Sequence, residues 1–172
     1  MATMEFTLNE SSINWDLFEK VFPTHKTHQL IKDFVHSIDP EIKVHMSSDK
    51  FYCIINEKLV NVPFASNPEG DRLIYEFVLD KFGVAINPYL IGILHEVFHI
   101  ITYDENLDRD RDILYYMLQL DFKEERYEEF NRMYFSIPSE FEATKGAVNY
   151  YLTHKDYCDN FIKQLEKGEW HV

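Results

Sequence analysis

Residues 95 to 99 read HEVFH and place two imidazoles and a carboxylate within one short segment. On an α-helix, positions i and i+4 lie one above the other, so His95 and His99 would point the same way and could bind one zinc ion. Glu96 would project beside them, towards a water on that ion. Zinc lowers the pKa of such a water to about 7, and a glutamate can take its proton while a carbonyl is attacked. The pattern therefore predicts zinc-dependent hydrolysis of an amide bond, with Glu96 as the general base.

The segment around this motif predicts a buried helix over residues 88–103. Asn87 and Pro88 form an N-cap and first-turn pair that would open it. Apolar residues lie on nearly all sides of the helix: Leu90, Ile91, Ile93, Leu94, Val97, Phe98, Ile100 and Ile101. Two imidazoles and a carboxylate in such a helix cost several kcal/mol unless each finds a partner. One metal ion with its water would partner all three.

A zinc site needs a third protein ligand, and a later helix is the place to look for it. Residues 139–154 predict a long helix whose first turn carries Glu140 and Glu142. These two acids lie about 200° apart around a helix, so only one of them can face the metal. We expect Glu140, because it begins a single helical stripe. That stripe contains Glu140, Thr144, Ala147, Tyr151 and His154.

Hydrolysis also needs a donor for the developing oxyanion. The last helix offers Tyr150, Tyr151 and His154, and the stripe favours His154 and Tyr151. Packing in the core or at its rim is the alternative role for these tyrosines. The expected site thus comprises the zinc ligands His95, His99 and Glu140, with Glu96, His154 and Tyr151 as catalytic residues. The other histidines have no ligand spacing, and we expect them on the surface.

The motifs resemble those of gluzincin-type HExxH metallopeptidases, especially the small ImmA/IrrE-like and minigluzincin-like ones. In that family, HExxH is followed by a helix reading E-x-x-A-(D/N), whose first glutamate is the third zinc ligand. The resemblance implies this role for Glu140, and it places Thr144 where the family has an Asp or Asn that orients a ligand imidazole. The Thr144 hydroxyl could accept the same hydrogen bond. The resemblance covers residues 41 to 154 and includes strands that precede the HExxH helix.

The rest of the chain predicts a mainly helical α+β domain of the zincin type. Residues 42–46, 51–55 and 59–62 predict three strands of an antiparallel meander, with a substrate peptide along the edge at 59–62. Helices are expected over 13–22, 24–38, about 73–82 and 159–167. Residues 1–12 predict a polar arm before a single domain over 13–172. The charged segment 104–132 predicts a mobile or protruding helical flap beside the cleft.

Composition narrows the choice of function. The chain has 172 residues, 45% of them hydrophobic, which is enough to build one core. A formal charge of −13 excludes the basic surface that nucleic acids and anionic membranes require. No apolar run approaches the roughly 20 residues of a membrane span. The 2 cysteines cannot form a disulfide framework, so we expect a cytoplasmic protein.

The favoured function is a zinc metallopeptidase acting on a protein or peptide, and the acidic surface favours a basic target. One alternative is a zinc-containing regulatory or protein-binding module without catalysis. Glu96 argues against it, because a structural zinc site needs no base beside an open position. Another alternative is an acidic DNA mimic or anti-host factor in which the motif is accidental. Metal content separates that last class from the first two.

Overall fold

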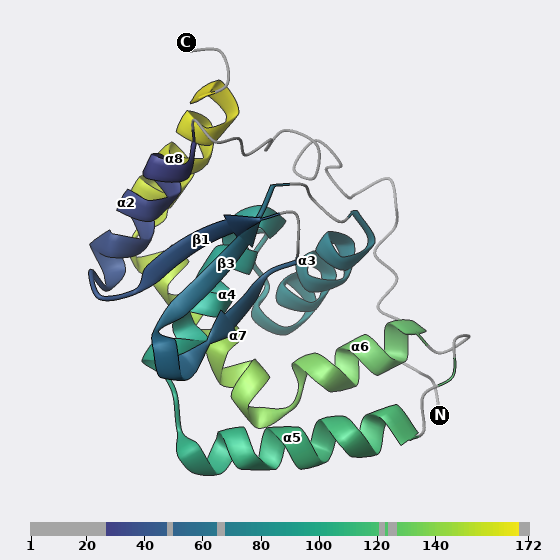
Figure 1. Ribbon diagram of the computed structural model, residues 1–172. Coiled ribbons are helices and arrows are strands. Elements are labelled where there is room, and N and C mark those ends of the chain that lie inside the picture. Colours follow the sequence, from purple (N-terminus) through teal and green to yellow (C-terminus); the bar gives the residue numbers. More distant parts are fainter. Residues whose placement is uncertain (1–26, 48–49, 65–67, 121–122, 124–126, 169–172) are drawn as a thin grey trace.

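A computed structural model describes residues 27–47, 50–64, 68–120, 123 and 127–168 (Figure 1). The predicted arm at 1–12 and the predicted helix at 13–22 lie outside these residues. The helices are α2 (His28–Ile38), α3 (Pro68–Phe82), α4 (Pro88–Ile101), α5 (Glu105–Leu120), α6 (Tyr127–Phe135), α7 (Pro138–Thr153) and α8 (Lys155–Gly168). The strands are β1 (Lys43–Ser47), β2 (Tyr52–Ile54) and β3 (Leu59–Pro63), and a short 3-10 turn, η2 (Ile55–Glu57), joins the last two. The mainly helical α+β prediction is confirmed.

The three strands do not form the antiparallel meander that we predicted. Their order is β1-β3-β2, and β3 runs parallel to β1 and antiparallel to β2. Every residue of β3 is buried, which requires neighbours on both sides, so this strand takes the centre. Buried Asn61 in β3 is satisfied there by donating to the Lys50 carbonyl and accepting from the Ser47 hydroxyl. The predicted substrate edge at 59–62 is therefore wrong, because β3 has no free edge.

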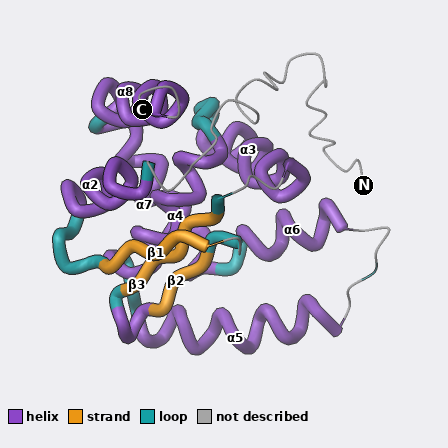
Figure 2. Tube along the Cα trace, turned by 45° about the horizontal axis from the view of Figure 1, so that its top comes forward, coloured by secondary structure: helices purple, strands orange, loops and turns teal. Residues whose placement is uncertain are grey.

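The two edges of this sheet differ. The outer edge of β1 is covered by α2, whose His28 and His36 lie 3.2 and 2.8 Å from the carbonyl oxygens of Val44 and Ile42. These two histidines are half-buried rather than on the open surface. Edge strands offer unpaired backbone groups to an added strand unless something covers them. In the described residues, β2 is the edge strand that lies beside α4 and α5 (Figure 2).

Helix α4 lies in the centre of the molecule, between the sheet and α7 (Figure 1). Its start follows the prediction: the Asn87 side chain accepts from the backbone N–H groups of Tyr89 and Leu90, and Pro88 occupies the first turn. Most of the helix is buried, as its apolar sequence predicts. The position of α4 is thus set by contacts on all its sides.

Two glycines allow close packing around α4. A Cβ at Gly146 of α7 would lie 2.6 Å from the Phe98 ring of α4, and a Cβ at Gly92 would lie 2.6 Å from the Phe51 ring. Real Cβ atoms do not approach so closely, so each ring occupies the space that a side chain would need. Phe98 directly precedes His99, and its contact with Gly146 therefore helps to set the spacing between α4 and α7.

Helices α5 and α6 cover most of the charged segment 104–132, for which we predicted a mobile or protruding helical flap. Helix α5 has no buried residue, and it lies along the outer margin in both views (Figures 1 and 2). The segment protrudes, whereas its mobility stays a prediction. Among the described residues, no helix combines the length and the apolar character of a membrane span.

We expect Gly146→Val to lower the free energy of unfolding by about 1–3 kcal/mol, because the new side chain overlaps the Phe98 ring. Urea denaturation measures the change. The double variant Gly146→Val/Phe98→Ala provides the control, since it removes both partners of the clash. Its loss should be smaller than the sum of the two single losses by about 1 kcal/mol. Additive losses would show that the two residues are not in contact.

Candidate metal centre

Three ligand atoms converge where α4 meets the first turn of α7. The Nε2 atoms of His95 and His99 each lie 3.0 Å from Oε1 of Glu140. One ligand atom from each residue lies within 4.8 Å of the other two. The structure therefore brings together the three residues that the sequence predicted as ligands. Glu142 is not part of this group.

Local helix geometry explains this convergence. His95 and His99 are one turn apart on α4, and their ring centroids are 4.5 Å apart. Glu140 lies in the first turn of α7, which begins at Pro138. Its carboxylate is almost fully buried, and the positive end of the helix dipole favours a negative charge there. Each ligand is therefore held by a helix that is itself packed in the core.

Thr144 orients the first imidazole. Its hydroxyl lies 2.9 Å from Nδ1 of His95 and donates to the backbone carbonyl of Glu140 at 3.1 Å. A hydroxyl has only one proton, so Thr144 must accept from Nδ1–H of His95. In the neutral ring, Nε2 then carries a lone pair and faces the carboxylate. The family resemblance implied this accepting role for Thr144.

The donor set fits a zinc ion. A lone pair of His95 that faces a carboxylate oxygen at 3.0 Å repels it unless a proton or a cation lies between them. Zinc takes imidazole and carboxylate ligands at about 2.0–2.1 Å, which in a tetrahedron separates ligand atoms by about 3.3 Å. The observed spacing is close to that value. Two histidines and a glutamate also leave the fourth position open, as catalytic zinc sites do.

Arg111 holds the other oxygen of Glu140. Its Nε donates to Oε2 at 3.0 Å, and its guanidinium lies over the rings of Tyr115 and Tyr134. Its NH2 group also donates to the Tyr134 hydroxyl at 3.4 Å. Sequence analysis missed both Arg111 and Tyr134, because they lie in or next to the segment interpreted as solvated. The helical periodicity of apolar residues does not show which arginine of a charged segment points inward.

The charges of the triad are coupled. Burial alone would raise the pKa of Glu140, but hydrogen bonds with His95 and His99 hold it well below its usual range. Burial alone would lower the pKa of His99, yet the contact with Glu140 raises it overall. The carboxylate is therefore ionised and available as a ligand.

Glu96 differs from Glu140 in its surroundings. It is only 8% exposed, and its Oε2 has no hydrogen-bond partner among the described residues. Burial raises the pKa of Glu96 above its ordinary value. A buried carboxylate oxygen without a partner is costly, and it suits a group that receives a proton from a bound water.

The triad opens into a cleft of about 690 Å³, a volume typical of ligand sites. Helices α4, α5, α6 and α7 and the edge strand β2 contribute its walls. Its lining includes His99 and Glu140 of the triad, the neighbouring Glu96, and the aromatic residues Phe51, Tyr52, Tyr115, Phe130 and Tyr134. A peptide side chain would fit this space. The cleft thus combines the proposed ligands and base with room for a substrate.

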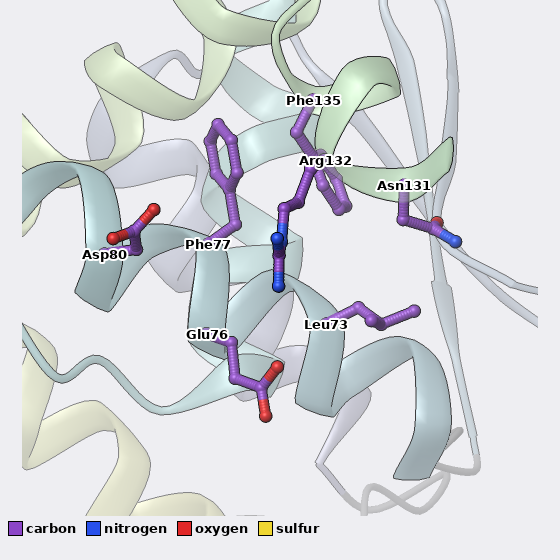
Figure 3. Close-up of a pocket in the computed structure, with 7 residues that line it drawn as sticks. All are labelled: Leu73, Glu76, Phe77, Asp80, Asn131, Arg132 and Phe135. Atoms are coloured by element: carbon purple, nitrogen blue, oxygen red, sulfur yellow. The ribbon is translucent and has the colours of Figure 1, made fainter. Parts of the chain in front are cut away.

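A second pocket lies between α3 and α6 (Figure 3). Its volume is about 20 Å³, which holds about one water molecule. Phe77 and Phe135 line it, with ring centroids 5.2 Å apart, and Phe135 also contacts the His95 ring edge-to-face at 6.5 Å. This pocket is too small for a substrate. Phe135 links this pocket to the triad through its contact with His95.

The predicted oxyanion donors Tyr151 and His154 are not at the site. They follow Glu140 by 11 and 14 positions, which carries them about 16 and 21 Å along α7. The Tyr151 hydroxyl donates to Asp159 at 2.8 Å, while His154 is exposed and stacks on Tyr150. Neither residue lines the cleft. The shared stripe is real, but the length of the helix separates its two ends.

Comparison with known proteins finds no match for this chain among family models, curated proteins or solved structures. Its function must therefore be argued from the residues and their geometry.

We expect the purified protein to bind about one zinc ion per chain through the triad. His95→Ala, His99→Ala and Glu140→Ala should each lose the metal, because each removes one of three ligands. Glu142→Gln is the matched control on α7 and should keep it, since Glu142 is outside the triad. Elemental analysis after dialysis against zinc gives the stoichiometry. A wild type that binds no zinc, or a Glu142 variant that loses it, would contradict the assignment.

Proposed function

We propose that the protein is a zinc-dependent metallopeptidase of the gluzincin type that hydrolyses a peptide bond in a protein or peptide. The observation that carries this proposal is the convergence of His95, His99 and Glu140 next to a cleft that His99 and Glu140 line together with the buried Glu96. The three ligands would hold the zinc ion. Once bound, zinc would supply Lewis acidity, which polarises a carbonyl and makes a water a stronger acid.

Glu96 is the general base in this proposal. Its unpartnered Oε2 can accept the proton of the attacking water and then deliver it to the leaving amine. A raised pKa makes the protonated carboxyl a weaker acid, so that it holds the proton between these two transfers. Glu140 is held in an ion pair by Arg111. Glu96 is therefore the buried carboxylate beside it that can take up this proton.

Two other residues are candidates for oxyanion stabilisation, Tyr134 and Arg111. They take the place of Tyr151 and His154, which do not line the cleft. Tyr134 and Arg111 line it together with Glu96 and Glu140. Burial raises the pKa of Tyr134, so its hydroxyl stays protonated at neutral pH and can donate to a developing negative charge. Arg111 already donates to Glu140 and to Tyr134, which makes Tyr134 the better direct donor and Arg111 its positioning residue.

The substrate in this proposal is an extended peptide that pairs with β2. Within the described part of the chain this strand pairs with β3 alone, and Tyr52 and Cys53 line the cleft. Backbone pairing with an edge strand binds a peptide in the extended form that a peptidase requires. The net charge of −13 favours a basic target. Free thiols at Cys53 and Cys158 support a reducing compartment such as the cytoplasm.

We expect Glu96→Gln to keep zinc but to reduce peptide hydrolysis by about 100-fold or more, because glutamine cannot accept the proton. Mass spectrometry of a mixed peptide library measures cleavage, and elemental analysis measures zinc. Glu142→Gln serves as the control for a lost carboxylate and should cleave as the wild type does.

A zinc-containing regulatory module makes the opposite prediction. Its biological effect would survive in Glu96→Gln and would disappear only when zinc or the fold is lost. A wild type that holds zinc but cleaves no library peptide, with an unchanged phenotype in Glu96→Gln, would replace the enzyme proposal by that one.

We expect Tyr134→Phe to lower kcat by about 100-fold with little change in KM, since an oxyanion donor acts mainly in the transition state. Zinc content should stay the same, because Tyr134 is not a ligand. Tyr151→Phe is the matched control at a distance from the cleft and should retain full activity. Equal losses in the two variants would mean that Tyr134 has no special part in the reaction.

A further inference from the structure

Asp108 of α5 is a carboxylate that lines the cleft without belonging to the triad. It is half-buried, and its side chain has no hydrogen bond or ion pair with any residue that the structure describes. Asp108 also lines a smaller pocket of about 10 Å³, and the two cavities share Asp108, His99 and Ile55. An unpaired carboxylate therefore lies in the wall of the cleft close to His99.

The nearest arginine does not neutralise Asp108. Arg111 follows it by three positions on α5, but each of the three guanidinium nitrogens already donates to another group. The acceptors are Glu140, Asp112 and the Tyr134 hydroxyl. Asp112 also lines the cleft, and this contact pairs it with Arg111. Asp108 therefore differs from Asp112 in having its charge available to a ligand.

Lys50 is the other cationic residue among the described residues that line the cleft. It lies just before β2, is exposed, and forms no ion pair with Asp108. A half-buried charge interacts more strongly with an opposite charge than an exposed one does, because less water screens it. A cation that enters the cleft is therefore bound more strongly by Asp108 than an anion is by Lys50.

The walls of the cleft suit a long basic side chain. Aromatic rings from α5, α6 and the region of β2 line it. Such rings attract cations over their faces and pack against the alkyl stems of lysine and arginine. The cleft already contains this type of contact, since the Arg111 guanidinium lies over the rings of Tyr115 and Tyr134.

Cys53 shows that Asp108 is near the strand on which the substrate would lie. Burial raises the pKa of the Cys53 thiol, and the negative charges of Glu96, Glu140 and Asp108 raise it further. Figure 2 shows β2, which carries Cys53, beside α5. A peptide paired with β2 would thus pass within reach of both Asp108 and the triad.

We propose that Asp108 determines the specificity of the cleft by binding the lysine or arginine side chain of a substrate residue next to the scissile bond. Its carboxylate would accept charge-assisted hydrogen bonds from the ammonium or guanidinium group. The closeness of Asp108 to His99 puts this contact beside the metal centre. The inference rests on the proposed peptidase function and names the substrate class for it.

The test is cleavage of a mixed peptide library by the zinc-loaded full chain, with mass spectrometry to identify the residues beside each cleaved bond. Matched peptides with lysine or glutamine at that position then give a ratio of kcat/KM values. We expect a ratio of about tenfold or more for the wild type and for Asp108→Glu, and about one for Asp108→Asn. Asp110→Asn removes an exposed acid of α5 outside the cleft and should keep the wild-type ratio.

Three outcomes of this test would overturn the inference and leave the peptidase proposal standing. One is cleavage without a preference for lysine or arginine. Another is an equal fall of the ratio in Asp108→Asn and Asp110→Asn, which would assign the preference to net charge, since each variant removes one negative charge. The third is a preference for glutamate that Lys50→Gln abolishes, which would assign recognition to Lys50.

A second measurement separates recognition from hydrolysis. The zinc-loaded Glu96→Gln chain is immobilised, and mass spectrometry identifies the library peptides that it retains. We expect lysine and arginine peptides to be enriched about tenfold, and this enrichment to be lost when Asp108→Asn is added but kept when Asp110→Asn is added. A wild type that cleaves no peptide would end the peptidase proposal even where this enrichment is found. Retention that does not depend on Asp108 would overturn the inference even where the wild type cleaves.

Discussion

The contact of α4 with the first turn of α7 is the constraint on which the site depends. It brings a carboxylate 41 and 45 positions away in sequence to 3.0 Å from two imidazoles. These groups lose water when they are buried, at a cost of several kcal/mol unless they are paired. The contacts with Thr144 and Arg111 offset part of that cost, and a metal ion would offset more. The packing of Phe98 on Gly146 sets the helix separation that makes all these contacts possible.

What could be predicted from the sequence is local. Helical periodicity correctly paired His95 with His99 and preferred Glu140 to Glu142, because each inference needs only the angle between residues on one helix. The contact of Thr144 with an imidazole was implied by the family resemblance instead. Asn87 and Pro88 likewise predicted the start of α4. The sheet order could not be read in this way. It depends on which strand is buried in the folded molecule, and the sequences of the three short strands do not show that.

The site residues that the sequence misplaced or missed depend on tertiary structure. A shared stripe fixes direction but not distance, so Tyr151 and His154 follow Glu140 on one stripe while lying about 16 and 21 Å further along α7. Arg111 and Tyr134 are distant from the motif in sequence and lie within hydrogen-bonding distance of each other, with Arg111 also bonded to Glu140. Their charge and polarity resemble those of the surrounding exposed residues. Only the tertiary arrangement of α5 and α6 distinguishes them.

The two sides of the cleft are held with unequal strength. Helices α4 and α7 belong to the core, whereas α5 has no buried residue and contacts the site through Arg111 and Tyr115. Segments with few buried apolar contacts open at a lower free-energy cost than the core does. A displacement of α5 would therefore carry Arg111 with it, while His95, His99 and Glu140 would stay on α4 and α7. The triad thus lies on the firmly packed side of the cleft, and the wall formed by α5 is the one that would open at the lower free-energy cost.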